Sequence, residues 1–332
     1  MTDWQIFRGT NEPHDGIARL PPPQQWRAFD GSPPVTAKLP TWSPVDVVRA
    51  SFYQADPQVL DLVNAALYLR RPLLVTGKPG VGKSTLALAV AHELGLGPVL
   101  RWPITSRTTL KDGLYTYDAI RRLHDVSTAK EQDEAETDIG RYITLGPLGT
   151  ALLPRERPRV LLIDEIDKSD IDLPNDLLNV FEEGEFTIPE LERAARGDQS
   201  SAHVSTADRG ADDVVVGDGS VRCRAFPFIV LTSNQEREFP PAFLRRCVPL
   251  QIWPPGREEL MRIVQARLDP DISAEATDLV VEFLRRRDAS DLATDHLLNA
   301  LYLTFHAARG GGDREQLAQR LLSHLPTSAT GT

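Results

Sequence analysis

A nine-residue stretch, GKPGVGKST at residues 77–85, constrains the fold of this 332-residue chain more than any other feature. An apolar strand-like run, PLLVT, leads directly into it, and a helix-like run, LALAVAHEL, follows. Gly77, Gly82, Lys83 and Ser84 occupy every fixed position of the pattern G-x-x-x-x-G-K-[ST], whose glycines let backbone N–H groups turn toward a phosphate chain. The stretch therefore predicts a strand, a phosphate loop and a helix in succession, with a bound nucleoside triphosphate.

Each position of the phosphate loop has an expected contact. The helix that begins near Lys83 presents its positive end to the phosphates, and the Lys83 ammonium is expected to reach the β and γ phosphates. The Ser84 hydroxyl is expected to ligate Mg²⁺, which prefers oxygen, and Thr85 to add a contact near the α-phosphate. The predicted nucleotide-binding residues are Gly77, Lys78, Pro79, Gly80, Val81, Gly82, Lys83, Ser84 and Thr85.

A second motif, RPRVLLIDEIDKSD at residues 157–170, is an apolar run that ends in Asp164 and Glu165. An unbroken apolar run is typical of a strand buried on both faces, and ligands bind at the carboxyl ends of such strands in open α/β sheets. We expect Asp164 to hold Mg²⁺ and Glu165 to polarise the attacking water as general base. This second carboxylate favours hydrolysis over phosphate transfer to a small molecule.

The third motif, FPFIVLTSNQEREFPPAFLRRCVPL at residues 226–250, predicts another buried strand. Asn234 follows its apolar run and is expected to orient the attacking water. Arg245 and Arg246 come about ten residues later, and either arginine can stabilise charge on the γ-phosphate as an arginine finger does. A finger that acts on a neighbouring subunit implies a ring.

Composition narrows the class of protein. The net charge of −10 and the pI of about 5.3 argue weakly against a general nucleic-acid binder. The two cysteines, Cys223 and Cys247, form neither a disulfide framework nor a zinc pattern. No apolar run approaches the roughly 18 residues of a membrane span, and the N-terminus lacks a signal-peptide layout. We expect a cytoplasmic protein.

The remaining segments define the expected organisation. Residues 1–50 are rich in proline and aromatics, and they are either an arm docked on the core or a neighbour, or a poorly ordered leader. Trp4, Trp26 and Trp42 favour docking, because exposed indoles lose the gain of burial. Strand and helix patterns alternate from Asp56 onward, which predicts a parallel sheet with crossover helices. The polar stretch at about 196–213 predicts a flexible surface loop, and four amphipathic helices follow residue 256.

Taken in order, the three motifs and the helical segment resemble the AAA+ ATPases, with GKPGVGKST as Walker A, LLIDEID as Walker B and LTSN as sensor 1. LTSNQEREFPPAFLRRC is similar to the MoxR and dynein-related branch. The resemblance implies an α/β P-loop core with a small all-helical lid. The resemblance covers roughly residues 50–325. Together with the composition of the two ends, it leads us to expect an N-terminal arm at 1–50, a core at 51–255 with inserts near 106–145 and 184–222, a lid at 256–326 and a tail at 327–332.

The same resemblance implies an ATP- and Mg²⁺-dependent ATPase that remodels a protein client as a ring, commonly a hexamer. A partner with a von Willebrand factor A domain is typical of the MoxR branch. Arg246 matches the position of the arginine finger, and Arg245 is the alternative. The lid lacks the usual sensor-2 arginine, and His296 is the nearest basic residue. A nucleic-acid motor and a nucleotide-dependent scaffold with little turnover remain alternative functions.

Overall fold

A computed structural model of the chain describes residues 4–128, 138–196, 201–267, 277–287 and 294–307. One compact unit comprises residues 1–75 and 84–250, and the other comprises residues 76–83 and 251–332. The larger unit contains nearly all of the sheet structure.

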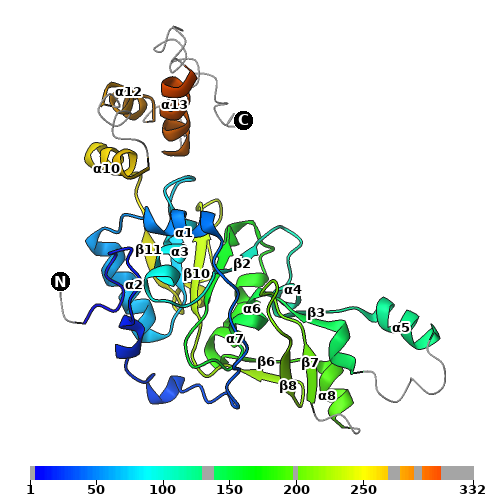
Figure 1. The fold of residues 1–332 in the computed structure, drawn as a ribbon. Helices are drawn as coiled ribbons and strands as arrows, with labels where there is room; N and C mark the ends of the chain where they lie inside the picture. Colours follow the sequence, from blue (N-terminus) through cyan, green and yellow to red (C-terminus); the bar gives the residue numbers. More distant parts are fainter. Residues whose placement is uncertain (1–3, 129–137, 197–200, 268–276, 288–293, 308–332) are drawn as a thin grey trace. The chain divides into compact units, whose positions relative to one another are not determined.

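A five-stranded parallel sheet forms the centre of the fold, with strand order β11-β1-β10-β5-β2 (Figure 1). The central strands β10 and β5 pair in parallel, with Ile229 opposite Leu161 and Leu231 opposite Ile163. All six residues of β10 are buried, as are the first four of β5, which confirms the prediction of strands covered on both faces. The strands of the sheet are β1 (Leu73–Thr76), β2 (Leu100–Pro103), β5 (Val160–Asp164), β10 (Phe228–Ser233) and β11 (Val248–Gln251).

Helices alternate with these strands, as the sequence pattern predicts. The helix after Asp56 begins at Pro57, and the Asp56 side chain caps it by accepting a hydrogen bond from the Val59 N–H at 2.8 Å. The helix after the phosphate loop ends two residues before Gly95, which has a φ of 62°. The α-helices of the larger unit are α1 (Pro44–Ser51), α2 (Pro57–Leu69), α3 (Lys83–Glu93), α4 (Leu110–Leu114), α5 (Ala119–Thr128), α6 (Pro147–Ala151), α7 (Leu173–Glu183), α8 (Pro189–Ala195) and α9 (Pro241–Leu244). Its short 3-10 helices are η1 (Gly16–Arg19), η2 (Gln25–Arg27), η4 (Ile139–Tyr142) and η5 (Ile166–Lys168).

Three antiparallel strand pairs interrupt the alternation, and Figure 1 shows them gathered on one side of the central sheet. The antiparallel pair β3–β4 flanks α5 in the sequence, so the expected insert near 106–145 contains helices as well as strands. The pairs β6–β9 and β7–β8 lie between α7 and β10 in the sequence. Their strands are β3 (Tyr115–Tyr117), β4 (Ile143–Leu145), β6 (Glu185–Thr187), β7 (Ser201–Val204), β8 (Val214–Gly217) and β9 (Ser220–Arg222).

The prediction of a flexible loop at 196–213 is wrong at Ser201–Val204, which form β7, and at the buried Asp208. Ala202 and Val204 of β7 are buried, and the Asp208 carboxylate forms a buried ion pair with the Arg159 guanidinium. The polar composition hid an alternating strand, because its two apolar residues gain their partners only from distant segments. Residues 197–200 of this stretch lie outside the described residues.

The N-terminal arm docks on α2 and α3. The buried Asn64 side chain accepts hydrogen bonds from the backbone N–H groups of Ile6 and Phe7 and donates one to the Phe7 carbonyl. Ile6 and Phe7 are buried, whereas Trp26 is 79% exposed and does not gain the burial that we expected for it. The helix α1, within the segment expected to be an irregular arm, was not predicted.

The fully buried Glu93 carboxylate, at the end of α3, holds the next part of the arm. It accepts hydrogen bonds from the backbone N–H groups of Arg8, Gly9 and Asn11 at 2.6, 3.2 and 3.1 Å. His14 Nε2 lies 3.1 Å from the same carboxylate. These contacts compensate a buried charge that the negative end of a helix would otherwise disfavour.

The smaller unit contains α10 (Arg257–Arg267), α12 (Thr277–Arg287) and α13 (Thr294–Ala307). Their apolar faces meet around Val264, Phe283, Leu297 and Leu301, all of which are fully buried. The expected fourth helix, REQLAQRLLSHL, lies outside the described residues.

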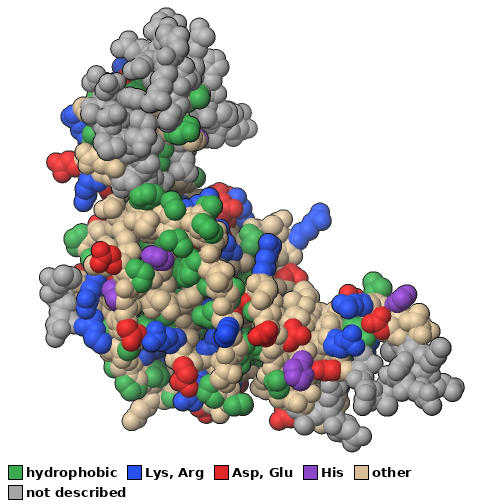
Figure 2. Space-filling view, viewed as in Figure 1, with side chains coloured by type: hydrophobic (Ala, Val, Ile, Leu, Met, Phe, Trp, Pro, Cys, Tyr) green, Lys and Arg blue, Asp and Glu red, His purple; other side chains and the backbone are tan. Residues whose placement is uncertain are grey.

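Two surface properties bear on function. None of the described helices has the length and apolar content that crossing a bilayer requires. Figure 2 shows basic and acidic side chains interspersed over the visible face of the larger unit, without a large region of one sign.

Candidate functional site

The carboxyl ends of β5 and β10 bring three polar side chains together. Asp164 ends β5, and its Oδ1 accepts hydrogen bonds from the hydroxyls of Ser84 at 2.8 Å and Thr232 at 2.6 Å. The Thr232 hydroxyl in turn accepts from the Glu165 N–H at 2.9 Å. The register that sets Leu231 opposite Ile163 makes this contact possible, because the next residue of each strand is then Thr232 and Asp164.

Glu165 adopts a left-handed backbone conformation, with φ of 61° and ψ of 49°. Such a conformation costs a non-glycine residue about 1–3 kcal/mol and is frequent at functional sites. The Glu165 carboxylate is 43% exposed and forms a 2.7 Å ion pair with the Lys168 ammonium. This hydrogen bond raises the pKa of Lys168, which keeps the ammonium charged at neutral pH.

Asn234 lies directly after β10, beside the segment that carries Glu165. Its backbone N–H donates to the Asp167 carboxylate at 2.8 Å. Gln235, the next residue, also has a left-handed backbone with a φ of 64°. The two loops that follow the central strands therefore each contain one non-glycine residue in this unfavourable conformation.

The phosphate loop has the backbone that its glycines predict. Gly77, Gly80 and Gly82 have φ values of 154°, 75° and 93°, which side-chain-bearing residues rarely adopt. A Cβ at Gly77 would lie only 2.4 Å from the Ile252 carbonyl oxygen. The buried Lys83 ammonium donates to the carbonyls of Gly77 at 2.6 Å and Lys78 at 2.9 Å. Lys83 precedes Ser84 directly in the chain.

The two candidate finger arginines differ in their surroundings. Arg246 is 37% exposed, and its Nε forms a 2.8 Å ion pair with Glu182 at the end of α7. Its guanidinium also donates to the Ala242 carbonyl at 3.2 Å. Arg245 is exposed, and its carbonyl accepts a hydrogen bond from the Arg71 guanidinium. Among the contacts of the described residues, neither arginine contacts the Asp164 cluster. His296, the basic residue nearest to the usual sensor-2 position, lies on α13 and is half-buried.

Sequence reasoning missed three residues at these strand ends: Thr232, Lys168 and Asp167. Thr232 was identifiable as the first hydroxyl after an apolar run that pairs with β5. Lys168, three residues after Glu165, lies one helical turn away from it, a spacing at which opposite charges meet. Asp167 gave no signal, since its partners are backbone groups that only the fold brings near.

A clustered metal centre and a reactive thiol find no support among the described residues. No group of three or more His, Cys, Asp or Glu side chains in it is arranged to hold a metal ion. Burial raises the pKa of the Cys223 and Cys247 thiols to about 12, so neither is a nucleophile at neutral pH.

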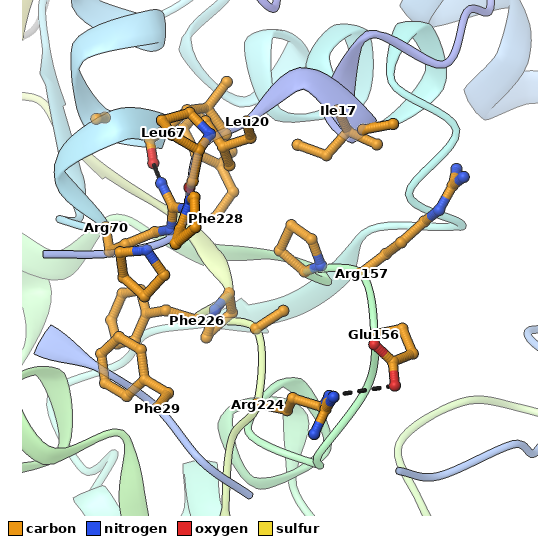
Figure 3. Close-up of a pocket in the computed structure, with 18 of the residues that line it drawn as sticks. Ile17, Leu20, Phe29, Leu67, Arg70, Glu156, Arg157, Arg224, Phe226 and Phe228 are labelled. Atoms are coloured by element: carbon orange, nitrogen blue, oxygen red, sulfur yellow. Dashed lines mark hydrogen bonds and ion pairs between the residues drawn. The ribbon is translucent and has the colours of Figure 1, made fainter. Parts of the chain in front are cut away.

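A cavity of about 770 Å³ lies at the other end of the same strands, where β5 and β10 begin. Figure 3 shows Phe29, Phe226 and Phe228 on one side of it and the Arg224–Glu156 ion pair on the other. The N-terminal arm supplies part of its lining. The cavity is therefore separated from Asp164 and Thr232 by the length of the central strands.

A family model agrees with this architecture. The family model of the AAA domain, dynein-related subfamily, matches residues 72–247, just over half of the chain, and so contains the first two motifs and the third as far as Cys247. The comparison with curated proteins gave no match. Among solved structures, domain III of the Thermotoga maritima replication initiation protein DnaA is similar at 16% identity and a TM-score of 0.41, covering 83% of this chain and 95% of that chain.

The match confirms the resemblance to the AAA+ ATPases and to their dynein-related branch. The α/β P-loop core predicted from the three motifs is likewise confirmed, by the family match and by the parallel sheet. The chain belongs to the AAA domain family, in its dynein-related subfamily.

Proposed function

We propose that this protein binds ATP with Mg²⁺ and hydrolyses it to drive a conformational cycle. The observation that carries the proposal is the cluster at the carboxyl ends of β5 and β10. There Ser84, Asp164, Glu165 and Thr232 are joined by hydrogen bonds of 2.6–2.9 Å. This is the edge of an open α/β sheet at which ligands bind, and the phosphate loop leads directly into Ser84.

The phosphate loop binds the nucleotide in this proposal. Backbone N–H groups of Gly77–Gly82 surround the phosphates, and the Thr85 side chain adds a contact near the α-phosphate. The Lys83 ammonium exchanges its two carbonyl partners for β- and γ-phosphate oxygens. That exchange replaces neutral acceptors by charged ones, which strengthens the hydrogen bonds.

The residues present fit a magnesium site. The Ser84 hydroxyl and the Asp164 carboxylate lie 2.8 Å apart and are both oxygen donors, which Mg²⁺ prefers. Such a site needs only one or two protein oxygens, because phosphate oxygens and waters complete the coordination. Bound there, Mg²⁺ neutralises negative charge on the phosphate oxygens.

Glu165 is proposed as the general base that takes a proton from the attacking water, and Asn234 as the group that orients that water. The half-exposed Glu165 carboxylate is accessible to water and lies 2.7 Å from the Lys168 ammonium. The Thr232 hydroxyl fixes the Glu165 backbone through its N–H.

The test measures nucleotide affinity by calorimetry and phosphate release under steady-state conditions. Glu165→Gln is expected to bind ATP within about threefold of wild type and to lose turnover by about 10²- to 10⁴-fold. Lys83→Ala is expected to lose binding itself. The matched control is Glu156→Gln, an exposed carboxylate at the opposite end of β5, which leaves both quantities unchanged. Normal turnover in Glu165→Gln would show that Glu165 is not the general base. Tight ATP binding without turnover in wild type would identify a nucleotide-dependent scaffold.

We further propose that the protein assembles into a ring, as a hexamer, in which Arg246 of one subunit completes the site of the next. The ion pair with Glu182 holds the Arg246 side chain at a half-exposed position, from which the guanidinium can serve a neighbouring subunit. Arg246→Ala is expected to bind ATP normally and to lose turnover, and it is expected to poison wild-type subunits in mixed rings. Arg245→Ala is the matched comparison, and a larger loss there would reassign the finger.

On the basis of the family resemblance, we propose that the cycle acts on a protein client. A protein with a von Willebrand factor A domain is the proposed partner. Binding to nucleic acid is disfavoured by the net charge of −10 and by the mixed charges in Figure 2. Phosphate release measured at physiological salt, with and without duplex DNA, separates the two targets. Strong stimulation by DNA would favour a nucleic-acid motor instead.

A further inference from the structure

Two side chains tie the loops after β5 and β10 together. We call residues 165–170 the β5 loop and residues 234–237 the β10 loop. Asp167 Oδ2, in the β5 loop, accepts hydrogen bonds from the backbone N–H groups of Asn234 at 2.8 Å and Glu236 at 3.2 Å. In the opposite direction, the Arg237 guanidinium donates to the Ser169 carbonyl at 2.5 Å and lies 3.4 Å from the Asp170 carbonyl. Each loop therefore contributes one charged side chain to the backbone of the other.

The bonds from Asp167 lie on either side of Gln235, the residue of the β10 loop with a left-handed backbone. A strained residue keeps its conformation only where surrounding contacts impose it. Gln235 itself donates its N–H to the Ser233 hydroxyl at 2.9 Å, so three consecutive amides of the loop, at 234–236, are held by side chains. Asn234 is the first of these three residues, and its backbone is held directly by the Asp167 carboxylate.

The burial of the Asp167 carboxylate is energetically unfavourable for a contact that only stabilises the fold. Asp167 is only 5% exposed, and its Oδ1 is a buried oxygen without a hydrogen-bond partner among the described residues. A buried carboxylate is unfavourable unless its oxygens are well bonded. A buried, incompletely satisfied charge beside Glu165 and Asn234 therefore calls for an explanation beyond stability.

We propose that Asp167 and Arg237 are positioning residues that fix the Asn234 side chain relative to Glu165, so that both contact the same attacking water. Neither residue touches the nucleotide in this account. The inference rests on the proposed ATP hydrolysis and adds to it the two residues that set the geometry of the orienting amide. The two contacts act on the same pair of loops, so their effects are expected to be coupled rather than independent.

The test combines kinetics with hydrogen exchange in the full-length protein, at a temperature well below the unfolding transition of every variant. Asp167→Ala and Arg237→Ala are each expected to lower kcat by about 10- to 100-fold while the affinity for ATP stays within about threefold. Asp167→Asn, which keeps an acceptor oxygen of the same shape, is expected to lose less. The double variant is expected to lose clearly less than the product of the two single losses. Asp30→Ala and Arg224→Ala, exposed residues away from these loops, are matched controls and are expected to keep wild-type kcat.

Hydrogen exchange separates this inference from the proposed function. The peptide that covers residues 233–238 is expected to exchange faster in Asp167→Ala than in wild type. Unchanged exchange, or a lowered unfolding temperature with wild-type kcat, would overturn the positioning role while ATP hydrolysis stands. Faster exchange in Asp167→Ala, together with a wild type that binds ATP and never hydrolyses it, would instead overturn the proposed function.

Discussion

Two buried carboxylates perform similar tasks in different regions of the molecule. Glu93 holds the N-terminal arm on α3, and Asp167 holds the loop after β10. Both accept hydrogen bonds from backbone N–H groups far along the chain. Glu93 has bonds on both oxygens and is fully buried, whereas Asp167 uses one oxygen and leaves the other without a partner among the described residues.

The difference indicates what each region is built for. A fully bonded carboxylate is typical of a contact that stabilises the fold, because every buried polar atom has a partner. The incompletely bonded Asp167 lies beside two left-handed residues, Glu165 and Gln235, where the chain tolerates strain. We expect substitutions at Glu93 to affect stability and those at Asp167 to affect turnover.

The largest effect on stability is expected for Glu93→Ala. The change leaves three backbone N–H groups and His14 without their acceptor, and we expect a loss of about 3–5 kcal/mol in the free energy of unfolding. Urea denaturation measures it. The control is Glu12→Ala, an exposed carboxylate of the same arm. A loss below about 1 kcal/mol would show that the arm is not held through Glu93.

Asn64→Ala is expected to follow, with a loss of about 2 kcal/mol. Its side chain bonds the N–H groups of Ile6 and Phe7, which become buried and unsatisfied when it is removed. Gln58→Ala, on an exposed position of the same helix, serves as the control in the same denaturation series. A comparable fall in kcat for folded Asn64→Ala would contradict the separation of the two regions, because the arm would then influence turnover as well as stability.

Thr232→Val tests the other region with a change that preserves shape. It removes the hydroxyl that joins Asp164 to the Glu165 N–H, and we expect kcat to fall about 10- to 100-fold, or about 1.4–2.7 kcal/mol in activation free energy. The unfolding free energy is expected to change less than for Asn64→Ala. Thr187→Val, at an exposed threonine of β6, is the control. Wild-type kcat in Thr232→Val would show that the Thr232 hydroxyl does not contribute to turnover.

His14→Ala is expected to have the smallest effect, below about 1 kcal/mol in unfolding free energy. Glu93 keeps its three backbone partners in this variant, and the imidazole is partly exposed. His124→Ala on α5 is the control. A loss as large as that of Glu93→Ala would mean that the arm is attached to Glu93 mainly through the His14 imidazole and not through its backbone N–H groups.

Much of the site was predictable from local sequence, because the phosphate loop, Asp164 and Glu165 belong to short continuous motifs. The central strands were predictable as well, since uninterrupted apolar runs mark strands buried on both faces. Asp167, Glu93 and Asn64 were not predictable, because their partners are backbone amides of distant segments. The strand β7 was not predicted for a related reason. Its two buried residues lie in a polar stretch, and they are buried only through contacts with distant segments.

The most direct measurement is a single-turnover experiment, in which excess protein is mixed with radiolabelled ATP and Mg²⁺ and the bound nucleotide is analysed after acid quench. We predict that wild type converts the bound ATP to ADP and phosphate, while Glu165→Gln returns it intact. ATP recovered intact from wild type, or equal conversion by Glu165→Gln, would contradict the assignment of ATP hydrolysis to the carboxyl ends of β5 and β10.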